Sequence, residues 1–173
     1  MDFGILDYIQ LHLRSNLLDA VMPVITRLGD GGILWILCSL TLILFPRTRK
    51  TGAAMAAGLA LEALCCNIIL KPFVARIRPY DINTGVHLLI SPPTDFSFPS
   101  GHTGASFTAT SVLWFSKNRL WIPALVISIL IAFSRLYLYV HYPSDVLAGA
   151  MLGIMLGWLG NAVVNVADRK LHS

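Results

Sequence analysis

The sequence predicts an all-α integral membrane protein: a helical bundle of about five transmembrane helices, preceded by an N-terminal amphipathic segment at the membrane interface. Three observations support this class. Of the 173 residues, 55% are hydrophobic and only 13% are charged, which is more apolar than a soluble domain of this length needs to be. Apolar stretches recur along the chain, and basic residues are confined to short segments between them. Neither internal repeats nor low-complexity linkers divide the chain, so residues 1–173 are interpreted as one domain.

The composition also argues against several functional classes. The formal net charge is +4, but the basic residues form no continuous stripe with interleaved aromatics, so nucleic acid is not an expected partner. Cys38, Cys65 and Cys66 lie in apolar runs and offer neither a disulfide framework nor a metal-ligand spacing. The first 30 residues carry several charges and lack a continuous apolar core, so no cleavable signal peptide is expected.

Residues 1–30 make up the predicted interfacial segment. Apolar residues from Phe3 to Leu28 recur at steps of three and four, which is the period of one helical face. We expect one or two amphipathic helices here, with a bend at Pro23 and an end at Asp30-Gly31-Gly32.

Five apolar stretches are the candidate spans: 33–45, 52–70, 101–115, 120–139 and 146–166. The first is short against the ~20 residues that a spanning helix needs, so we expect it to begin inside the preceding segment or to lie where the bilayer thins. Three short segments are basic, which places them in the cytoplasm: the connections 46–50 and 116–119 and the segment 168–170. The connections 71–100 and 135–145 then face the extracytoplasmic side of the cell membrane, and they hold nearly every residue with chemistry to offer.

The first candidate site motif lies at the outer end of the second span. Lys71, Arg76 and Arg78 put three cations within nine residues. Basic residues at a helix end can simply snorkel to the headgroups. Topology should push cations to the opposite side, however, so an anionic ligand is the simpler explanation, because guanidinium groups bind phosphate oxygens in pairs.

The second motif, Pro99-Ser100-Gly101-His102, opens the third span. Ser100 is a good helix cap, and the free amide groups of a helix start form an anion site at the positive end of the helix dipole. A plain helix cap with an incidental histidine is the alternative.

The third motif joins the fourth and fifth spans and contains Ser134-Arg135, His141 and Asp145. A histidine four residues ahead of an aspartate at a helix entry can hydrogen-bond to it, which fixes the ring tautomer and raises the basicity of the other nitrogen. Alternatively, Ser144 or Asp145 only caps the fifth helix, and His141 lies in the headgroup layer.

Together the three motifs resemble the type 2 phosphatidic acid phosphatase superfamily, which also includes glucose-6-phosphatase and the vanadium haloperoxidases. The family signature is Lys, six residues, Arg-Pro; then Pro-Ser-Gly-His; then Ser-Arg, five residues, His, three residues, Asp. Every fixed position is present, in order, within residues 71–145, the predicted catalytic core. Charge counting independently assigns all three motifs to one membrane face.

The resemblance implies a mechanism through a phosphohistidine. His141 would attack phosphorus, Asp145 would orient it, and His102 would protonate the departing oxygen and later activate water. An imidazole titrates near pH ~6.5, so a neutral and a protonated histidine can coexist near neutrality. The implied phosphate-binding residues are Lys71, Arg78, Ser100, Gly101 and Arg135.

Neither a metal ion nor another cofactor is expected. Asp81 and Asp95 are interpreted as isolated loop residues, so this face has no carboxylate cluster suited to a metal. Three cations and a helix N-terminus can supply the positioning and charge stabilisation that phosphoryl transfer requires.

The substrate is expected to be an amphiphile, because the site lies at headgroup depth and a lipid can enter sideways between helices. By analogy with small bacterial family members we favour undecaprenyl diphosphate, with phosphatidylglycerophosphate and phosphatidic acid as alternatives. A non-catalytic lipid-phosphate binding or transport protein is the rival of another class. The sequence does not define the oligomeric state.

Three further features lie outside the motifs. Glu62, within the second span, is interpreted as a neutral or hydrogen-bonded bundle residue, with a functional role as the alternative. Gly149, Gly153 and Gly157 predict close helix packing inside the bundle rather than dimerisation. The apolar patch 88–90 predicts either a lid on the bilayer or an ordinary interfacial anchor.

Overall fold

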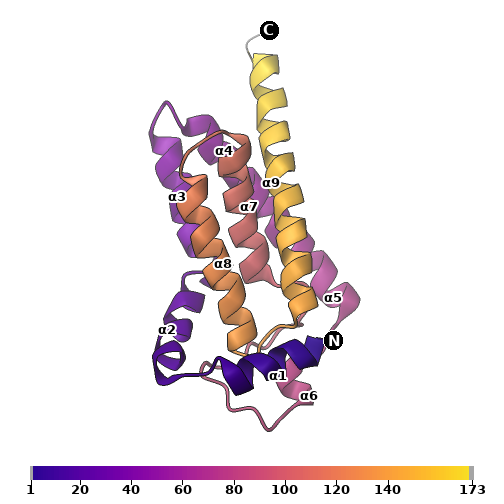
Figure 1. Ribbon diagram of the computed structural model, residues 1–173. Helices are drawn as coiled ribbons and strands as arrows, with labels where there is room; N and C mark the ends of the chain where they lie inside the picture. Colours follow the sequence, from indigo (N-terminus) through magenta and orange to yellow (C-terminus); the bar gives the residue numbers. More distant parts are fainter. Residues whose placement is uncertain (1, 172–173) are drawn as a thin grey trace.

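The computed structural model describes residues 2–171, and all regular elements among them are helical (Figure 1). The predicted all-α class is therefore confirmed. The elements are α1 (Asp2–His12), α2 (Asn16–Arg27), the 3-10 turn η1 (Asp30–Gly32), α3 (Ile33–Leu44), α4 (Arg49–Ala63), the π-helical η2 (Leu64–Leu70), α5 (Lys71–Val74), α6 (Pro79–Ile82), α7 (Gly101–Phe115), α8 (Trp121–Tyr137) and α9 (Pro143–Leu171).

Helix α7 lies at the centre of the bundle and contacts α3, α4, α8 and α9 (Figure 1). Its buried face is rich in hydroxyl groups, and several of them have partners on neighbouring helices, whereas Thr108 Oγ1 has none within residues 2–171. The indole nitrogen of Trp35 donates to Ser106 over 3.0 Å, and the hydroxyls of Thr110 and Ser128 lie 2.8 Å apart. A central helix can carry these polar side chains because surrounding helices shield it and satisfy its hydrogen bonds.

The glycines of α9 let it pack directly on α7 and α4. A Cβ atom on Gly149 would lie 2.6 Å from the Ser100 carbonyl oxygen, and one on Gly160 would lie 2.5 Å from the Ala54 carbonyl oxygen. Such distances leave no room for a side chain. The predicted close packing inside the bundle is thus confirmed.

Within residues 2–171, two helices are long and apolar enough to cross a membrane: Arg49–Ile82 and Pro143–Lys170. A third candidate arises if Asn16–Arg27 and Asp30–Leu44 count as one span, bent by 43°. This pair agrees with the expectation that the short stretch 33–45 begins inside the preceding segment. Pro23 lies inside the continuous α2, and the change in direction follows Arg27, where Gly31 and Gly32 have φ values of 57° and 67°.

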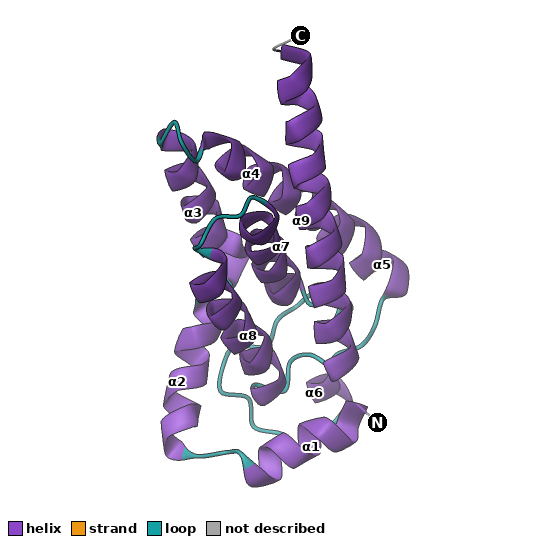
Figure 2. Cartoon of the chain, turned by 45° about the horizontal axis from the view of Figure 1, so that its top comes forward, coloured by secondary structure: helices purple, strands orange, loops and turns teal. Residues whose placement is uncertain are grey.

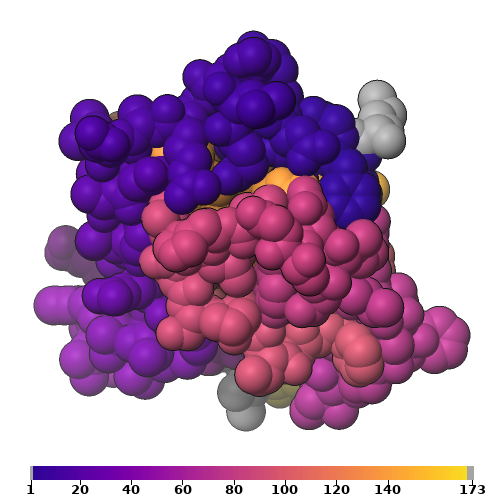
Figure 3. Space-filling model, turned by 90° about the horizontal axis from the view of Figure 1, so that it is seen from below, coloured from indigo at the N-terminus to yellow at the C-terminus, as the bar shows by residue number. Residues whose placement is uncertain are grey.

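The two ends of the bundle differ in character. The α3–α4 and α7–α8 connections and the end of α9 gather at one end, where Lys50 Nζ lies 2.6 Å from Asp168 Oδ2 (Figure 1). At the other end, here called the loop end, α1 and α6 lie across the bundle together with the long connection before α7 (Figure 2). Figure 3 shows this end covered by the N-terminal segment and by residues between α4 and α7.

Candidate active site

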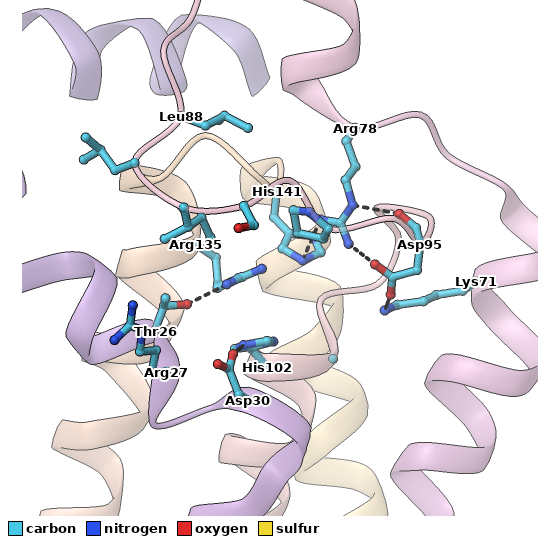
Figure 4. Close-up of a pocket in the computed structure, with 15 residues that line it drawn as sticks. Thr26, Arg27, Asp30, Lys71, Arg78, Leu88, Asp95, His102, Arg135 and His141 are labelled. Carbon is cyan, nitrogen blue, oxygen red and sulfur yellow. Dashed lines mark hydrogen bonds and ion pairs between the residues drawn. The ribbon is translucent and has the colours of Figure 1, made fainter.

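A cavity of about 740 Å³ opens at the loop end and brings separated parts of the chain together (Figure 4). Six of the eight predicted site residues line it: Lys71, Arg78, Gly101, His102, Arg135 and His141. The other two, Ser100 and Asp145, are fully buried and are not among its lining residues. The three sequence motifs therefore meet at one end of the bundle.

His141 lies in the turn between α8 and α9, which passes through Tyr139 at a φ of 59°. Its Nε2 is 3.2 Å from Arg78 Nη1. A guanidinium can only donate, so Nε2 is assigned as the acceptor and the ring proton as lying on Nδ1. Burial lowers the pKa of His141, as do the charges of Arg135 and Arg78, and they outweigh the raising effect of Asp145. His141 is therefore a neutral imidazole.

Asp145 stands on the Nδ1 side of this ring. Its Oδ2 lies 3.5 Å from His141 Nδ1, which is longer than a good hydrogen bond, so the predicted pair is present as a close contact. The carboxylate accepts hydrogen bonds from Arg76 Nη1 at 2.5 Å, from Ser97 Oγ at 2.5 Å and from the Tyr142 amide at 3.0 Å. These three donors fix its orientation.

Arg76 has a different place from its two basic neighbours. We grouped it with Lys71 and Arg78 as a cation cluster for an anionic ligand, but it forms ion pairs with Asp145 and Asp2 and stacks over the Tyr142 ring. Its guanidinium thus supports the orienting carboxylate and ties the start of α1 to the start of α9.

Asp95 is not the isolated loop residue that we predicted. It forms an ion pair with Lys71 Nζ, and its Oδ1 accepts from Arg78 Nη2 at 2.6 Å. Burial acts to raise the pKa of Asp95, but Lys71 and Arg78 more than offset this effect and lower it to about 2. The loop before α7 folds back over the cavity, which brings together residues 17 and 24 positions apart.

His102 occupies the first turn of α7, and its Nε2 lies 2.9 Å from Asp30 Oδ1. The ring packs so closely on the chain before η1 that a Cβ atom on Gly29 would lie 2.6 Å from His102 Cδ2. We interpreted Asp30 only as part of a helix-ending signal, so sequence reasoning missed its contact with a motif residue. Nothing in its local sequence pattern points to His102, 72 positions away.

Arg135 and Ser100 complete the predicted set. Arg135 is buried, and its Nη1 donates to Thr26 Oγ1 at 2.5 Å, while its Nε has no partner within residues 2–171. The Ser100 hydroxyl lies 3.0 Å from that of Thr103, and its amide donates to the Asp145 carbonyl oxygen at 3.1 Å. Ser100 thus joins the start of α7 to the start of α9.

The loop patch Leu88, Leu89 and Ile90 lines the same cavity and packs against side chains of α1, α2 and α8. A smaller cavity of about 280 Å³ adjoins the first and shares Lys71, Asp95, Gly101 and His102 with it. Glu62 lines this second cavity; it is buried in the bundle as expected, and its Oε1 has no hydrogen-bond partner within the described part of the chain. Residues 2–171 contain no group of three or more His, Cys, Asp or Glu placed to hold a metal ion.

The neutral imidazole of His141 faces Lys71, Arg78 and Arg135, and the imidazole of His102 lines the same cavity. This arrangement is suited to phosphoryl chemistry. The chain belongs to the PAP2 superfamily, whose family model matches residues 51–169. The family resemblance carried by the three motifs is therefore confirmed.

Individual relatives cover nearly the whole chain. An undecaprenyl-diphosphatase of Sulfolobus acidocaldarius is 32% identical over 97% of this chain and 79% of its own length. The crystal structure of a transmembrane PAP2 type phosphatidylglycerolphosphate phosphatase from Bacillus subtilis matches with a TM-score of 0.75 and 30% identity, covering 98% of this chain and 85% of that one. The crystal structure of Aquifex aeolicus LpxE matches with a TM-score of 0.79 and 30% identity, over 92% and 93% of the two chains.

Proposed function

We propose that this protein is a membrane phosphatase that hydrolyses a lipid phosphate or diphosphate through a phosphohistidine intermediate on His141, without a metal ion. The observation that carries the proposal is that His141 and His102 line one cavity together with Lys71, Arg78 and Arg135. The proposal is supported by the family to which the chain belongs, because proteins of that family that are similar to this chain are named as lipid phosphatases.

In the first step, Nε2 of His141 forms a bond to phosphorus while the bond from phosphorus to the leaving oxygen breaks. The His102 ring, protonated on both nitrogens, gives its Nδ1 proton to that oxygen, while its Nε2–H stays hydrogen-bonded to Asp30 and holds the ring in place. In the second step, His102 takes a proton from water, the water oxygen attacks phosphorus, and the bond to His141 breaks to release phosphate. Asp145 stabilises the positive charge that develops on His141.

Lys71, Arg78 and Arg135 neutralise the non-bridging oxygens, with the Ser100 hydroxyl and the Gly101 amide completing the predicted clamp. Phosphoryl transfer depends mainly on positioning and charge stabilisation, and these fixed groups supply both. We therefore expect full turnover in EDTA, and loss of activity with a chelator would contradict these roles.

We also propose that the bundle crosses the membrane five times, with the interfacial segment at the loop end and the cavity open to the extracytoplasmic side. The supporting observation is that the basic connections and the C-terminal end of α9 lie together at the end opposite the cavity (Figure 1). Cytoplasmic connections carry the excess of Lys and Arg in membrane proteins.

The substrate is an amphiphile whose phosphate enters the larger cavity. The second cavity is lined by apolar residues of α3, α4 and α7, Ile36, Leu59 and Ala105, beside the shared His102, so it offers space for the start of an apolar tail. Among lipids we favour undecaprenyl diphosphate because a relative covering almost the whole chain carries that activity in its name. Phosphatidylglycerophosphate and phosphatidic acid are the alternatives.

The test is phosphate release by the purified protein from a panel of lipid monophosphates and diphosphates. Wild-type protein and His12→Ala, an exposed histidine of α1, should release phosphate, and His141→Ala should not. A non-catalytic binding or transport protein would release no phosphate, and its ligand binding would survive His141→Ala.

A further inference from the structure

A fourth cation faces the larger cavity and lies outside the three sequence motifs. Arg27, the last residue of α2, lines that cavity together with Lys71, Arg78 and Arg135. Within residues 2–171, Arg27 has no side-chain hydrogen bond or ion pair. Lys71, Arg78 and Arg135 are each tied to another side chain, so Arg27 is the cavity cation whose guanidinium remains entirely available to a ligand.

The backbone that carries Arg27 is nevertheless fixed to the clamp. Its neighbour Thr26 is buried and accepts the 2.5 Å hydrogen bond from Arg135. The amide of Gly29 donates to the Thr26 carbonyl oxygen at 2.9 Å, which closes the end of α2. Arg27 is therefore an exposed side chain on an anchored segment rather than a cation on a free loop.

The roles proposed for the two histidines set the side of the reacting phosphorus on which the leaving group lies. His141 lines only the larger cavity, whereas His102 lines both. With His141 as nucleophile and His102 as proton donor, the breaking bond points from phosphorus toward the His102 side of the larger cavity. Arg27 lines this cavity and not the adjoining one, so it can meet only a group that stays in the larger cavity. Figure 4 shows Arg27 beside Thr26, on the side of the cavity where Asp30 and His102 lie and across from Lys71.

An anionic group just beyond the breaking bond would thus meet Arg27. Lys71, Arg78 and Arg135 are already assigned to the oxygens of the transferred phosphate, and Asp95 offsets part of their charge. We propose that Arg27 binds the phosphate that stays on the lipid when a lipid diphosphate is cleaved, and so makes the enzyme prefer diphosphates to monophosphates. This inference rests on the proposed function.

Farnesyl diphosphate and farnesyl monophosphate test the proposal, because they share one apolar tail and differ only in the second phosphate. For wild-type protein, kcat/KM should be higher for the diphosphate. Arg27→Gln removes a hydrogen bond to a charged group, so its kcat/KM for the diphosphate should fall by about 10- to 100-fold, and its kcat/KM for the monophosphate by less than about 2-fold. Arg27→Lys should be intermediate, since it keeps the charge but not the paired donors.

Arg119→Gln is the matched control, because Arg119 is an exposed arginine in the connection at the opposite end of the bundle. It should leave both substrates unchanged. An equal loss for both substrates in Arg27→Gln, or an unchanged diphosphate rate, would overturn the assignment of Arg27 while leaving the phosphatase intact. If wild-type protein released phosphate from neither substrate, the proposed function would fail and the role of Arg27 with it.

Discussion

Nη1 of Arg78 donates a hydrogen bond to Nε2 of His141, with 3.2 Å between the two nitrogens. This bond occupies the lone pair that would attack phosphorus. Because the donor is also a predicted phosphate ligand, a bound phosphate can draw the guanidinium away and free Nε2 for reaction. The same bond keeps the ring proton on Nδ1, which faces Asp145.

Asp145→Asn should lower kcat by at least about 100-fold, because a neutral amide cannot stabilise the charge that develops on a histidine. Asp2→Asn is the matched control: Asp2 also pairs with Arg76 and accepts from Ser144 at 2.5 Å, but it has no contact with His141 among those described. Activity of Asp2→Asn should stay within about 3-fold of wild type. Similar losses in both variants would mean that Asp145 acts only through Arg76.

His141 should make the folded protein sensitive to acid. Its pKa is lowered by burial, so between that value and the unfolded value near ~6.5 the unfolded chain binds a proton that the folded chain does not. Stability is therefore lost as the pH falls below ~6.5, by about 2 kcal/mol at pH 5. Thermal unfolding in detergent at pH 8 and pH 5 should show a smaller decrease in Tm for His141→Gln than for wild type. Equal decreases would contradict a buried, neutral imidazole.

Asp95→Asn should strengthen the binding of inorganic phosphate. The carboxylate pairs with Lys71 and Arg78, the same cations that we assign to the substrate, so it competes with an anionic ligand. Removing its charge should lower the inhibition constant of phosphate by about 3- to 10-fold. Because its pKa is about 2, Asp95 stays ionised from pH 5 to 9, and the effect should be present throughout that range. Weaker phosphate binding in Asp95→Asn would show that orienting the cations matters more than competition.

Gly29→Ala should impair the proton donor without removing any catalytic group. The new methyl group would lie 2.6 Å from His102 Cδ2, so the ring must shift from the position in which it contacts Asp30. A displacement of this size can cost about 100-fold in rate. Gly4→Ala in α1, where nothing lies within 4 Å of the added atom, should keep wild-type kcat. A wild-type rate for Gly29→Ala would argue against a fixed His102.

The motifs predicted the centre of the site because each lies next to the start or end of a helix. Lys71 begins α5, Gly101 begins α7 and Arg135 precedes the end of α8 by two residues, so predicting the helices also predicted where these side chains gather. The basic connections predicted that the motifs lie together at the opposite end of the bundle, since charge asymmetry can be read from sequence alone.

The contacts that complete the site could not be predicted in the same way. Asp95, Asp30 and Thr26 lie in a loop, in a short turn and near a helix end. The sequence there has no periodic pattern that predicts in which direction the chain turns, so it does not predict their partners. The turn after Arg27 depends on two glycines with positive φ, and Arg76 points to Asp145 although it lies between two cavity-facing cations. Such contacts depend on how separate helices meet in space.

The central claim is that phosphate passes through His141. Purified protein would be mixed with a lipid diphosphate carrying ³²P in its terminal phosphate, quenched with alkali within milliseconds and digested. We expect label that is stable in alkali and lost in acid, on the peptide that contains His141, and no label in His141→Ala. Rapid phosphate release with no labelled protein at any quench time, or label on another residue, would contradict the account.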